Sequence, residues 1–170
     1  AMGWLLDQQI EKRSEALRWL EAPIGGWPTE SGGREHLDLA STCTVLETLE
    51  SLPEHSPHIG RARAARRRAC GVLLAMQESD GSFARFVRGE DRRPLLLQAW
   101  GSSEVLSPAT EDRNARITLS ARVLARLAGL GLDRDDDRVA RGIEWLRPRS
   151  AGGMRDLGVS AIAAVAEAFG

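Results

Sequence analysis

The chain has 170 residues, enough for one domain that buries roughly 70% of its unfolded surface around a single core. Hydrophobic residues make up 42% of it and charged residues 28%, a balance that excludes an intrinsically disordered protein. The formal net charge of −1 argues against a general polyanion binder, so we expect no nucleic-acid partner.

The cysteines and the apolar runs indicate the compartment. Cys43 and Cys70 lack metal-ligand spacing and neighbouring histidines, so we expect buried free thiols in a reducing compartment, without a metal or a cofactor. The sequence contains neither a signal peptide nor an apolar run of membrane length. These features predict a cytoplasmic protein; they do not indicate membrane contact, although they leave it open. Residues 1–3 are given no structural role.

The first half of the chain predicts three helices. The first spans about residues 4–21, and Pro23 ends it because proline cannot continue a helix. The second spans about 37–52, with apolar residues one turn apart on one face. After a break the third spans about 59–77.

The second half predicts three more helices. After a long connection, residues 115–130 form a helix, and about 135–146 pair with about 157–169. No segment alternates as a half-buried strand does, so the predicted fold class is all-α.

A short turn connects these helices in a repeated way. The loop from Gln77 to Phe83 has two weaker echoes, from Pro23 to Trp27 and from Ser150 to Met154. Each follows an arginine-rich segment, ends at glycines with a large side chain close behind, and precedes a more apolar segment. This repetition predicts one domain of three stacked helical hairpins. The hairpins span about 4–52, 58–130 and 135–170.

The two helices of a hairpin differ in character. Residues 61–68 are charged around much of the helix, whereas residues 157–169 are apolar nearly all round and must be buried on every side. We therefore expect two layers, with charged helices outside and apolar helices inside, in an (α/α) toroid-like barrel. An insertion at about 88–113 is either a lid or a surface loop, and loop statistics favour neither.

These repeats resemble those of squalene–hopene cyclases and related class II terpene cyclases. The stretch from Gln77 through Gly81, Phe83 and Phe86 resembles the family's QW motif, a glutamine–glycine–aromatic turn between an outer and an inner helix. Residues 37–46 resemble the inner helix that begins with the family's D-x-D-D-T-A acid motif. The resemblance implies an α/α toroid that encloses a polyene and cyclises it.

The acid motif is degenerate. When Thr42 is aligned with the family's threonine, only Asp38 remains of its three aspartates, and the position of the proton donor holds Ala40. The family's histidine that polarises this acid is replaced by Arg122. A second run, residues 133–136, matches the letters of the motif but precedes an outer helix, where acids favour helix capping.

The resemblance also implies candidate substrate-binding residues. Aromatic side chains on or near the turns could line a π-rich pocket for a polyene, or they could anchor helix ends by packing. Packing is favoured for Trp27 and Phe83, and the two interpretations are even for Phe86 and Trp100.

Two charged residues have open roles as well. Asp38 is either the cap of its helix, the favoured interpretation, or a catalytic polar group in the pocket. Arg122 could hold a polar or anionic part of a substrate, although a solvated salt bridge is the safer interpretation.

Two functional hypotheses follow from the resemblance. The first is a small terpene-cyclase-like enzyme, of the isomerase or lyase class, that binds an apolar polyunsaturated isoprenoid or polyketide-like molecule. It would promote cyclisation mainly by positioning, with pericyclic closure as one route. The second is a non-catalytic α/α module that binds an apolar ligand or completes a larger toroid. Three hairpins leave apolar inner helices open on one side, which predicts closure by a homodimer, by another domain or by a tightened barrel.

Overall fold

A computed structural model describes residues 1–29, 37–86, 88 and 113–150 of the chain. The structure in these ranges is helical, with two isolated bridges (Pro28 to Leu37 and Gln77 to Phe83) in place of any strand. This confirms the all-α prediction. The helices are α1 (Met2–Asp7), α2 (Glu15–Trp19), α3 (Leu39–Glu50), α4 (Ile59–Ala75), α6 (Arg113–Gly129) and α7 (Asp137–Ser150).

Four predicted helices are confirmed, with ends that differ from the prediction by at most four residues. They are α3, α4, α6 and α7, whose apolar periodicity is long enough to fix both their existence and their type. The predicted helix at 157–169 and the insertion at 88–113, apart from its two end residues, lie outside the described ranges.

The predicted single helix over residues 4–21 is wrong. The chain forms α1, leaves the helix, and begins α2 only at Ser14, whose side chain caps it by accepting from the Leu17 N–H. Between them Ile10 pairs its backbone with the first glycine turn, donating to Gly26 at 2.9 Å and accepting from Gly25 at 2.7 Å. These tertiary hydrogen bonds replace helical ones.

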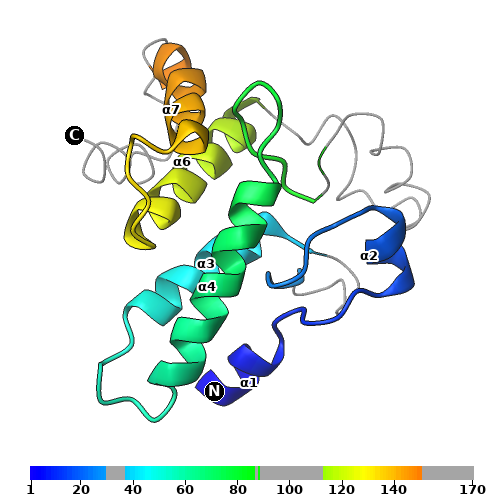
Figure 1. The fold of residues 1–170 in the computed structure, drawn as a ribbon, viewed down its shortest axis with the longest axis vertical. Helices are drawn as coiled ribbons and strands as arrows, with labels where there is room; N and C mark the ends of the chain where they lie inside the picture. Colours follow the sequence, from blue (N-terminus) through cyan, green and yellow to red (C-terminus); the bar gives the residue numbers. More distant parts are fainter. Residues whose placement is uncertain (30–36, 87, 89–112, 151–170) are drawn as a thin grey trace.

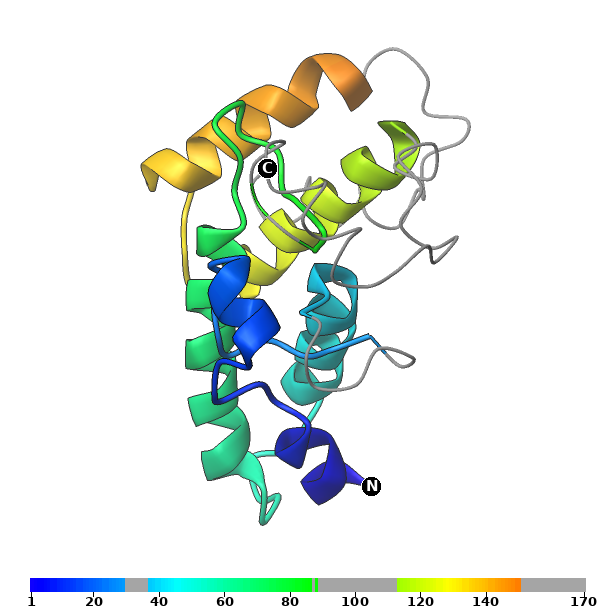
Figure 2. The same cartoon turned by 90° about the vertical axis from the view of Figure 1, so that its right-hand side faces the viewer.

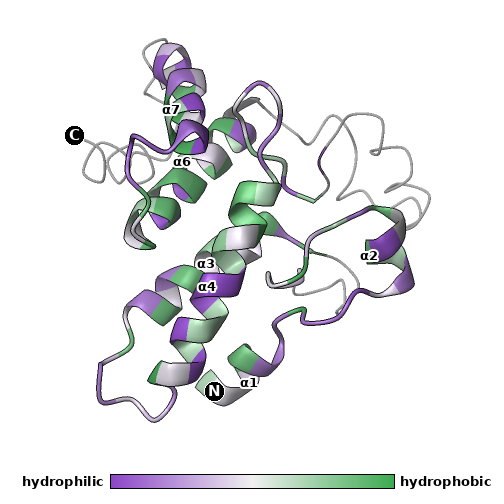
Figure 3. Ribbon diagram, in the orientation of Figure 1, coloured by the Kyte–Doolittle hydropathy of each residue, from purple (hydrophilic) through white to green (hydrophobic). Residues whose placement is uncertain are grey.

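The helices form two layers (Figures 1 and 2). Helices α4 and α7 lie on one side, and α3 and α6 lie on the other, with α6 packed against both α3 and α7. Helix α6 is inner in character, since between residues 115 and 129 only Ala115 and Gly129 are exposed. The outer helices mix hydrophilic and hydrophobic residues along their length (Figure 3). The two predicted layers are therefore present, while closure into a toroid remains a prediction.

Candidate functional site

The first inner helix begins at Asp38, the residue predicted to be catalytic or capping. Asp38 is 2% exposed and is the N-cap of α3. Its Oδ1 accepts from the Ala40 N–H at 3.0 Å, and its Oδ2 accepts from the Ser41 hydroxyl at 2.8 Å. The structure therefore forms the cap that the sequence favoured, while the catalytic role remains a prediction.

Arg85 completes the surroundings of this carboxylate. Its Nε donates to Asp38 Oδ1 at 2.9 Å and its Nη2 donates to Oδ2 at 3.2 Å. Each carboxylate oxygen thus accepts two hydrogen bonds, so that all four acceptor sites of the carboxylate are occupied. Arg85 was not predicted from the sequence, although it lies within the QW-like stretch.

Phe86 lies next to this ion pair. The Arg85 guanidinium stands 4.6 Å from the centre of the Phe86 ring, a cation–π contact, and Phe86 is half-buried. The structure therefore brings Asp38 and Phe86 together through one arginine. That arginine covers one face of the ring.

Trp27 and Phe83 are buried and held in equivalent ways. The backbone N–H of Trp27 donates to the Thr42 hydroxyl at 3.0 Å, and that of Phe83 donates to the Ser120 hydroxyl at 3.2 Å. Trp27 is 2% exposed and Phe83 is 0% exposed. Each therefore anchors its turn to an inner helix, which agrees with the packing interpretation. Contact with a substrate remains a prediction for both, and Trp100 lies outside the described ranges.

Arg122 bridges the inner helices α6 and α3, away from Asp38. Its Nη2 donates to the Thr44 hydroxyl at 2.9 Å and to Glu47 Oε1 at 3.3 Å, and its side chain is 29% exposed. A role in holding a substrate stays a prediction. The neighbouring Glu50 pairs with Arg126, and burial, opposed by this arginine, raises the pKa of Glu50.

The solvent-facing stripe of α3 is polar. It starts at the half-buried Ala40 and Ser41 and continues with the exposed Thr44, Glu47 and Thr48. The opposite face holds the apolar core residues of the helix, such as Leu46 at 0% exposure. Any cavity that this helix borders on its open side therefore has hydroxyl and carboxylate groups along that wall.

A glutamine joins each of the two glycine turns that the structure describes to the next outer helix, in the same way. The Gln77 amide donates to the carbonyls of Gly81 at 3.2 Å and Arg138 at 2.7 Å, and its oxygen accepts from Arg141 at 3.3 Å. Gly81 has a φ of +94°, which only glycine adopts readily.

Gln9 makes the matching contacts in the first hairpin. Its amide donates to the carbonyls of Gly25 at 2.6 Å and Ala65 at 2.9 Å, and its oxygen accepts from Arg68 Nε at 3.0 Å. Gly25, with a φ of +112°, is therefore the counterpart of Gly81. Gln9 was not predicted from the sequence because 16 residues, including α2, separate it from Gly25.

The second acidic run caps a helix, as the sequence favoured. Asp136 Oδ1 accepts from the Arg138 N–H at 2.9 Å at the start of α7, and Asp133 Oδ1 accepts from the Asp135 N–H at 2.8 Å. The run lies in the outer layer, apart from Asp38.

Both cysteines are free thiols, as predicted, but only Cys43 is buried, whereas Cys70 is half-buried. Burial raises the pKa of Cys43 to about 12, and burial also raises the pKa of Cys70. In the part of the chain that the structure describes, no three histidine, cysteine or acidic side chains gather as metal ligands would. No described helix has the length and apolarity that crossing a membrane requires.

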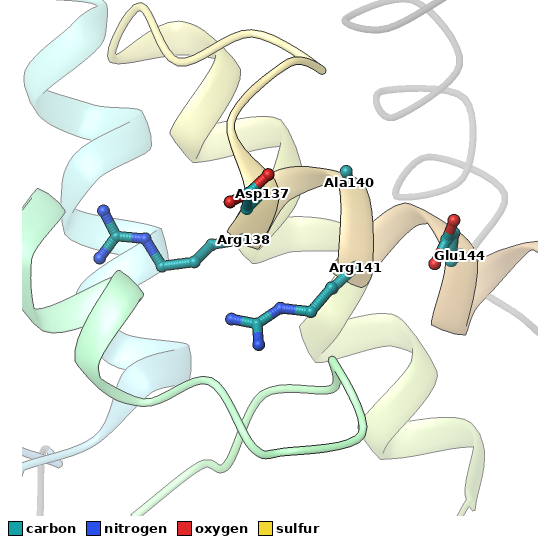
Figure 4. Close-up of a pocket in the computed structure, with 5 residues that line it drawn as sticks. All are labelled: Asp137, Arg138, Ala140, Arg141 and Glu144. Atoms are coloured by element: carbon teal, nitrogen blue, oxygen red, sulfur yellow. The ribbon is translucent and has the colours of Figure 1, made fainter.

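One surface pocket of about 540 Å³ lies on α7 (Figure 4). It is lined by Asp137, Arg138, Ala140, Arg141 and Glu144. The side chains of Arg138 and Arg141 extend across it toward α4 and the second glycine turn. The pocket belongs to the outer layer and does not include Asp38 or Phe86.

Comparison with known proteins gives one consistent relationship. Residues 1–153 match the family model described as the squalene-hopene cyclase C-terminal domain. Squalene-hopene cyclase of Schizosaccharomyces japonicus is 29% identical over 126 residues, which cover 72% of this chain and 17% of that protein. Drimenyl diphosphate synthase of Streptomyces showdoensis is 30% identical over 118 residues, which cover 69% of this chain and 20% of that protein.

A third relative extends the match further along the chain. Sporulenol synthase of Bacillus subtilis is 27% identical over 150 residues, which cover 86% of this chain and 22% of that protein. The matched residues thus make up about a fifth of the length of each of these three curated relatives.

Proposed function

This chain belongs to the squalene-hopene cyclase C-terminal domain family, and we propose that it is a terpene-cyclase-like enzyme that works without the family's aspartic acid. Its substrate would be an apolar polyunsaturated isoprenoid. The proposal is supported by the names of three relatives, each a cyclase or synthase of this kind. Cyclisation would be promoted mainly by positioning, which can supply roughly 7 kcal/mol or more in favourable cases.

The surroundings of Asp38 carry the acid-independent part of the proposal. An acid that protonates an alkene must hold a proton and present it to the substrate. Asp38 instead accepts four hydrogen bonds, two of them from Arg85. The position that aligns with the family's proton donor holds Ala40, which has no proton to give. Ring closure that results from holding the substrate in a reactive conformation requires neither a free Asp38 carboxyl nor an acid at position 40.

The test uses squalene, the polyene in the name of one relative, as its probe. The wild-type chain is incubated with squalene in detergent, products are identified by gas chromatography and mass spectrometry, and binding is followed by tryptophan fluorescence. We expect binding and a cyclised product, and we expect Asp38→Asn to retain turnover within about threefold, since asparagine keeps the cap. Loss of turnover in a folded Asp38→Asn variant would show instead that the carboxyl is the acid.

A gain-of-function variant sharpens the same test. Ala40→Asp places a carboxyl at the family's donor position, in the first turn of α3 where the helix dipole favours an acid. The matched control is Thr48→Asp, which adds the same charge on the exposed face of the same helix. If Ala40→Asp cyclises squalene faster or to a different product and Thr48→Asp does not, the result supports a family cyclisation site that lacks only its acid.

The polar stripe of α3 favours a second candidate function. Thr44, Glu47 and Thr48 are exposed on an inner helix, where an apolar substrate would meet hydroxyl and carboxylate groups. A non-catalytic α/α module that completes a larger toroid needs no apolar wall at this position. This candidate predicts neither squalene binding nor turnover, and light scattering after size-exclusion chromatography would reveal whether the chain forms the homodimer that the sequence suggested.

A further inference from the structure

Two arginines of the outer helices occupy equivalent positions. Arg68 of α4 donates to the Gln9 side chain at 3.0 Å, and Arg141 of α7 donates to the Gln77 side chain at 3.3 Å. In each helix the residue three positions earlier offers its carbonyl to the same glutamine. The two guanidinium groups are therefore placed alike relative to their glycine turns.

The residues that follow the two glutamines correspond as well. Ile10 and Glu78 each exchange two backbone hydrogen bonds with the end of their own turn, at 2.9 and 2.7 Å for Ile10 and at 2.8 and 3.1 Å for Glu78. The next residues, Glu11 and Ser79, are therefore equivalent. The first turn has a carboxylate at the position where the second has a hydroxyl.

This difference changes the partners of the two arginines. Arg68 Nη2 donates to Glu11 Oε1 at 3.0 Å in addition to its contact with Gln9. Among the residues that the structure describes, Arg141 has no such acidic partner, and its side chain donates to the neutral Gln77 oxygen. The place that a carboxylate oxygen fills beside Arg68 is thus left open beside Arg141.

The pocket on α7 lies beside Arg141 (Figure 4). Its volume is about 540 Å³, and the side chains of Arg138 and Arg141 extend across it toward α4 and the second glycine turn. Arg138 lies 3.6 Å from Asp136 Oδ1, but its side chain is 47% exposed. Its counterpart in the first hairpin is Ala65, since both offer their carbonyls to the glutamine. The second turn therefore has one guanidinium more and one carboxylate fewer beside it than the first.

The charge of the pocket limits the class of ligand. Asp137 and Glu144 line it together with Arg138 and Arg141, so two negative and two positive side chains give zero net charge. Such a lining does not concentrate polyanions. A ligand with one carboxylate, placed at the guanidinium groups, fits it better than a polyphosphate does.

We propose that the α7 pocket binds a small-molecule carboxylate, whose oxygens take the place beside Arg141 that Glu11 takes beside Arg68. A guanidinium group binds a carboxylate through charge-assisted hydrogen bonds, which are stronger than those between neutral groups. Arg138 supplies a second guanidinium, and the exposed Ser79 is too short to fill the place itself. The site lies in the outer layer, and it does not depend on the proposed cyclisation.

An NMR titration with sodium acetate, compared with sodium chloride at equal ionic strength, tests this proposal. The Nε–H signals of the arginines are followed in the 170-residue chain. We expect acetate to shift the Arg141 signal along a curve that saturates. Arg67, exposed on α4, is the internal control and should respond equally to the two salts.

Reciprocal substitutions at the two equivalent positions make the test specific. Ser79→Glu gives the second turn the carboxylate of the first, so it should weaken acetate binding at Arg141 by about tenfold or more, the loss of one charge-assisted hydrogen bond. Ser51→Glu adds the same charge at an exposed position at the end of α3 and should leave this binding unchanged. Glu11→Ser removes the internal carboxylate, so the Arg68 signal should then respond to acetate.

Three outcomes would overturn the proposal. If acetate moves the Arg141 signal no more than the Arg67 signal, the pocket binds no carboxylate. If Ser79→Glu leaves the response of Arg141 unchanged, the carboxylate does not occupy the place equivalent to that of Glu11. If the Arg141 signal shifts with protein concentration in the absence of acetate, an acidic side chain of a second copy is the occupant instead.

Discussion

Arg85 and Asp38, 47 residues apart in sequence, form a two-point ion pair with N–O distances of 2.9 and 3.2 Å. The Arg85 carbonyl also accepts from the Leu39 N–H at 2.9 Å. The end of the second glycine turn is thereby tied to the start of the first inner helix by both side chain and backbone. Asp38 therefore has two structural roles, since it caps α3 and holds Arg85.

Replacing Arg85 by leucine should destabilise the fold by about 1–3 kcal/mol, because it leaves a buried carboxylate without its main partner. Larger losses, as found when a fully buried ion pair is broken, are not expected, since the Arg85 side chain is 44% exposed and partly screened by water. The measurement is urea unfolding followed by circular dichroism. Arg67→Leu, on the exposed side of α4, is the control and should change stability little.

A double variant checks the mechanism of this loss. Adding Asp38→Asn to Arg85→Leu removes the uncompensated charge while keeping the cap, so it should recover part of the lost stability. Simple addition of the two single effects would contradict an ion pair between the two side chains.

Replacing Gln9 by alanine should cost about 1–3 kcal/mol, the penalty for leaving buried carbonyls without donors. Gln77→Ala should cost a similar amount, because the two amides make matching contacts. The control is Gln8→Ala, one residue away at the end of α1. If Gln9 and Gln8 variants unfold at the same urea concentration, Gln9 does not hold the first turn.

The limits of prediction from sequence are visible at the same glutamine. Helices α3, α4, α6 and α7 were predicted because each repeats its apolar residues over three or more turns. The break between α1 and α2 was missed because it depends on bonds from Gln9 to Gly25 and Ala65, 16 and 56 residues away. Local periodicity carries no information about such partners.

In the candidate site, too, local contacts could be predicted from the sequence and long-range contacts could not. The capping contacts of Asp38 reach only to Ala40 and Ser41, and they agree with the interpretation favoured from local sequence. Its pairing with Arg85 requires two hairpins to stack before the residues meet. The polar stripe of α3 likewise follows from which face its neighbours cover, which the sequence of the helix alone does not determine.

Gly81→Ala should be among the most destabilising single substitutions in the chain. Its φ of +94° already costs an alanine about 1–2 kcal/mol, and the added Cβ would lie 2.5 Å from the Arg141 carbonyl oxygen. Gly131→Ala is the matched control, since its φ of +89° carries the same conformational penalty but no atom lies within 4 Å of the new Cβ. The difference between the two variants in thermal unfolding measures the close packing of α7 on the turn. Equal losses would mean that the backbone conformation alone matters.

Asp80→Asn should remove a part of the acid sensitivity of the fold. Partial burial would raise the pKa of Asp80, but hydrogen bonds from Ser82, the charge of Arg116 and the Trp145 indole outweigh it and lower this pKa below 3.8. A lowered folded-state pKa means that the stabilisation is complete above pH 3.8 and is lost as the pH falls through the folded-state value. Asparagine can still accept from Trp145 but does not titrate. The stability difference between wild type and Asp80→Asn, measured by urea unfolding, should therefore be constant near neutral pH and shrink as the pH falls below 3.8. Asp135→Asn, at an exposed position before α7, is the control. A difference that does not change with pH would show that Asp80 acts only through its hydrogen bonds and not through its charge.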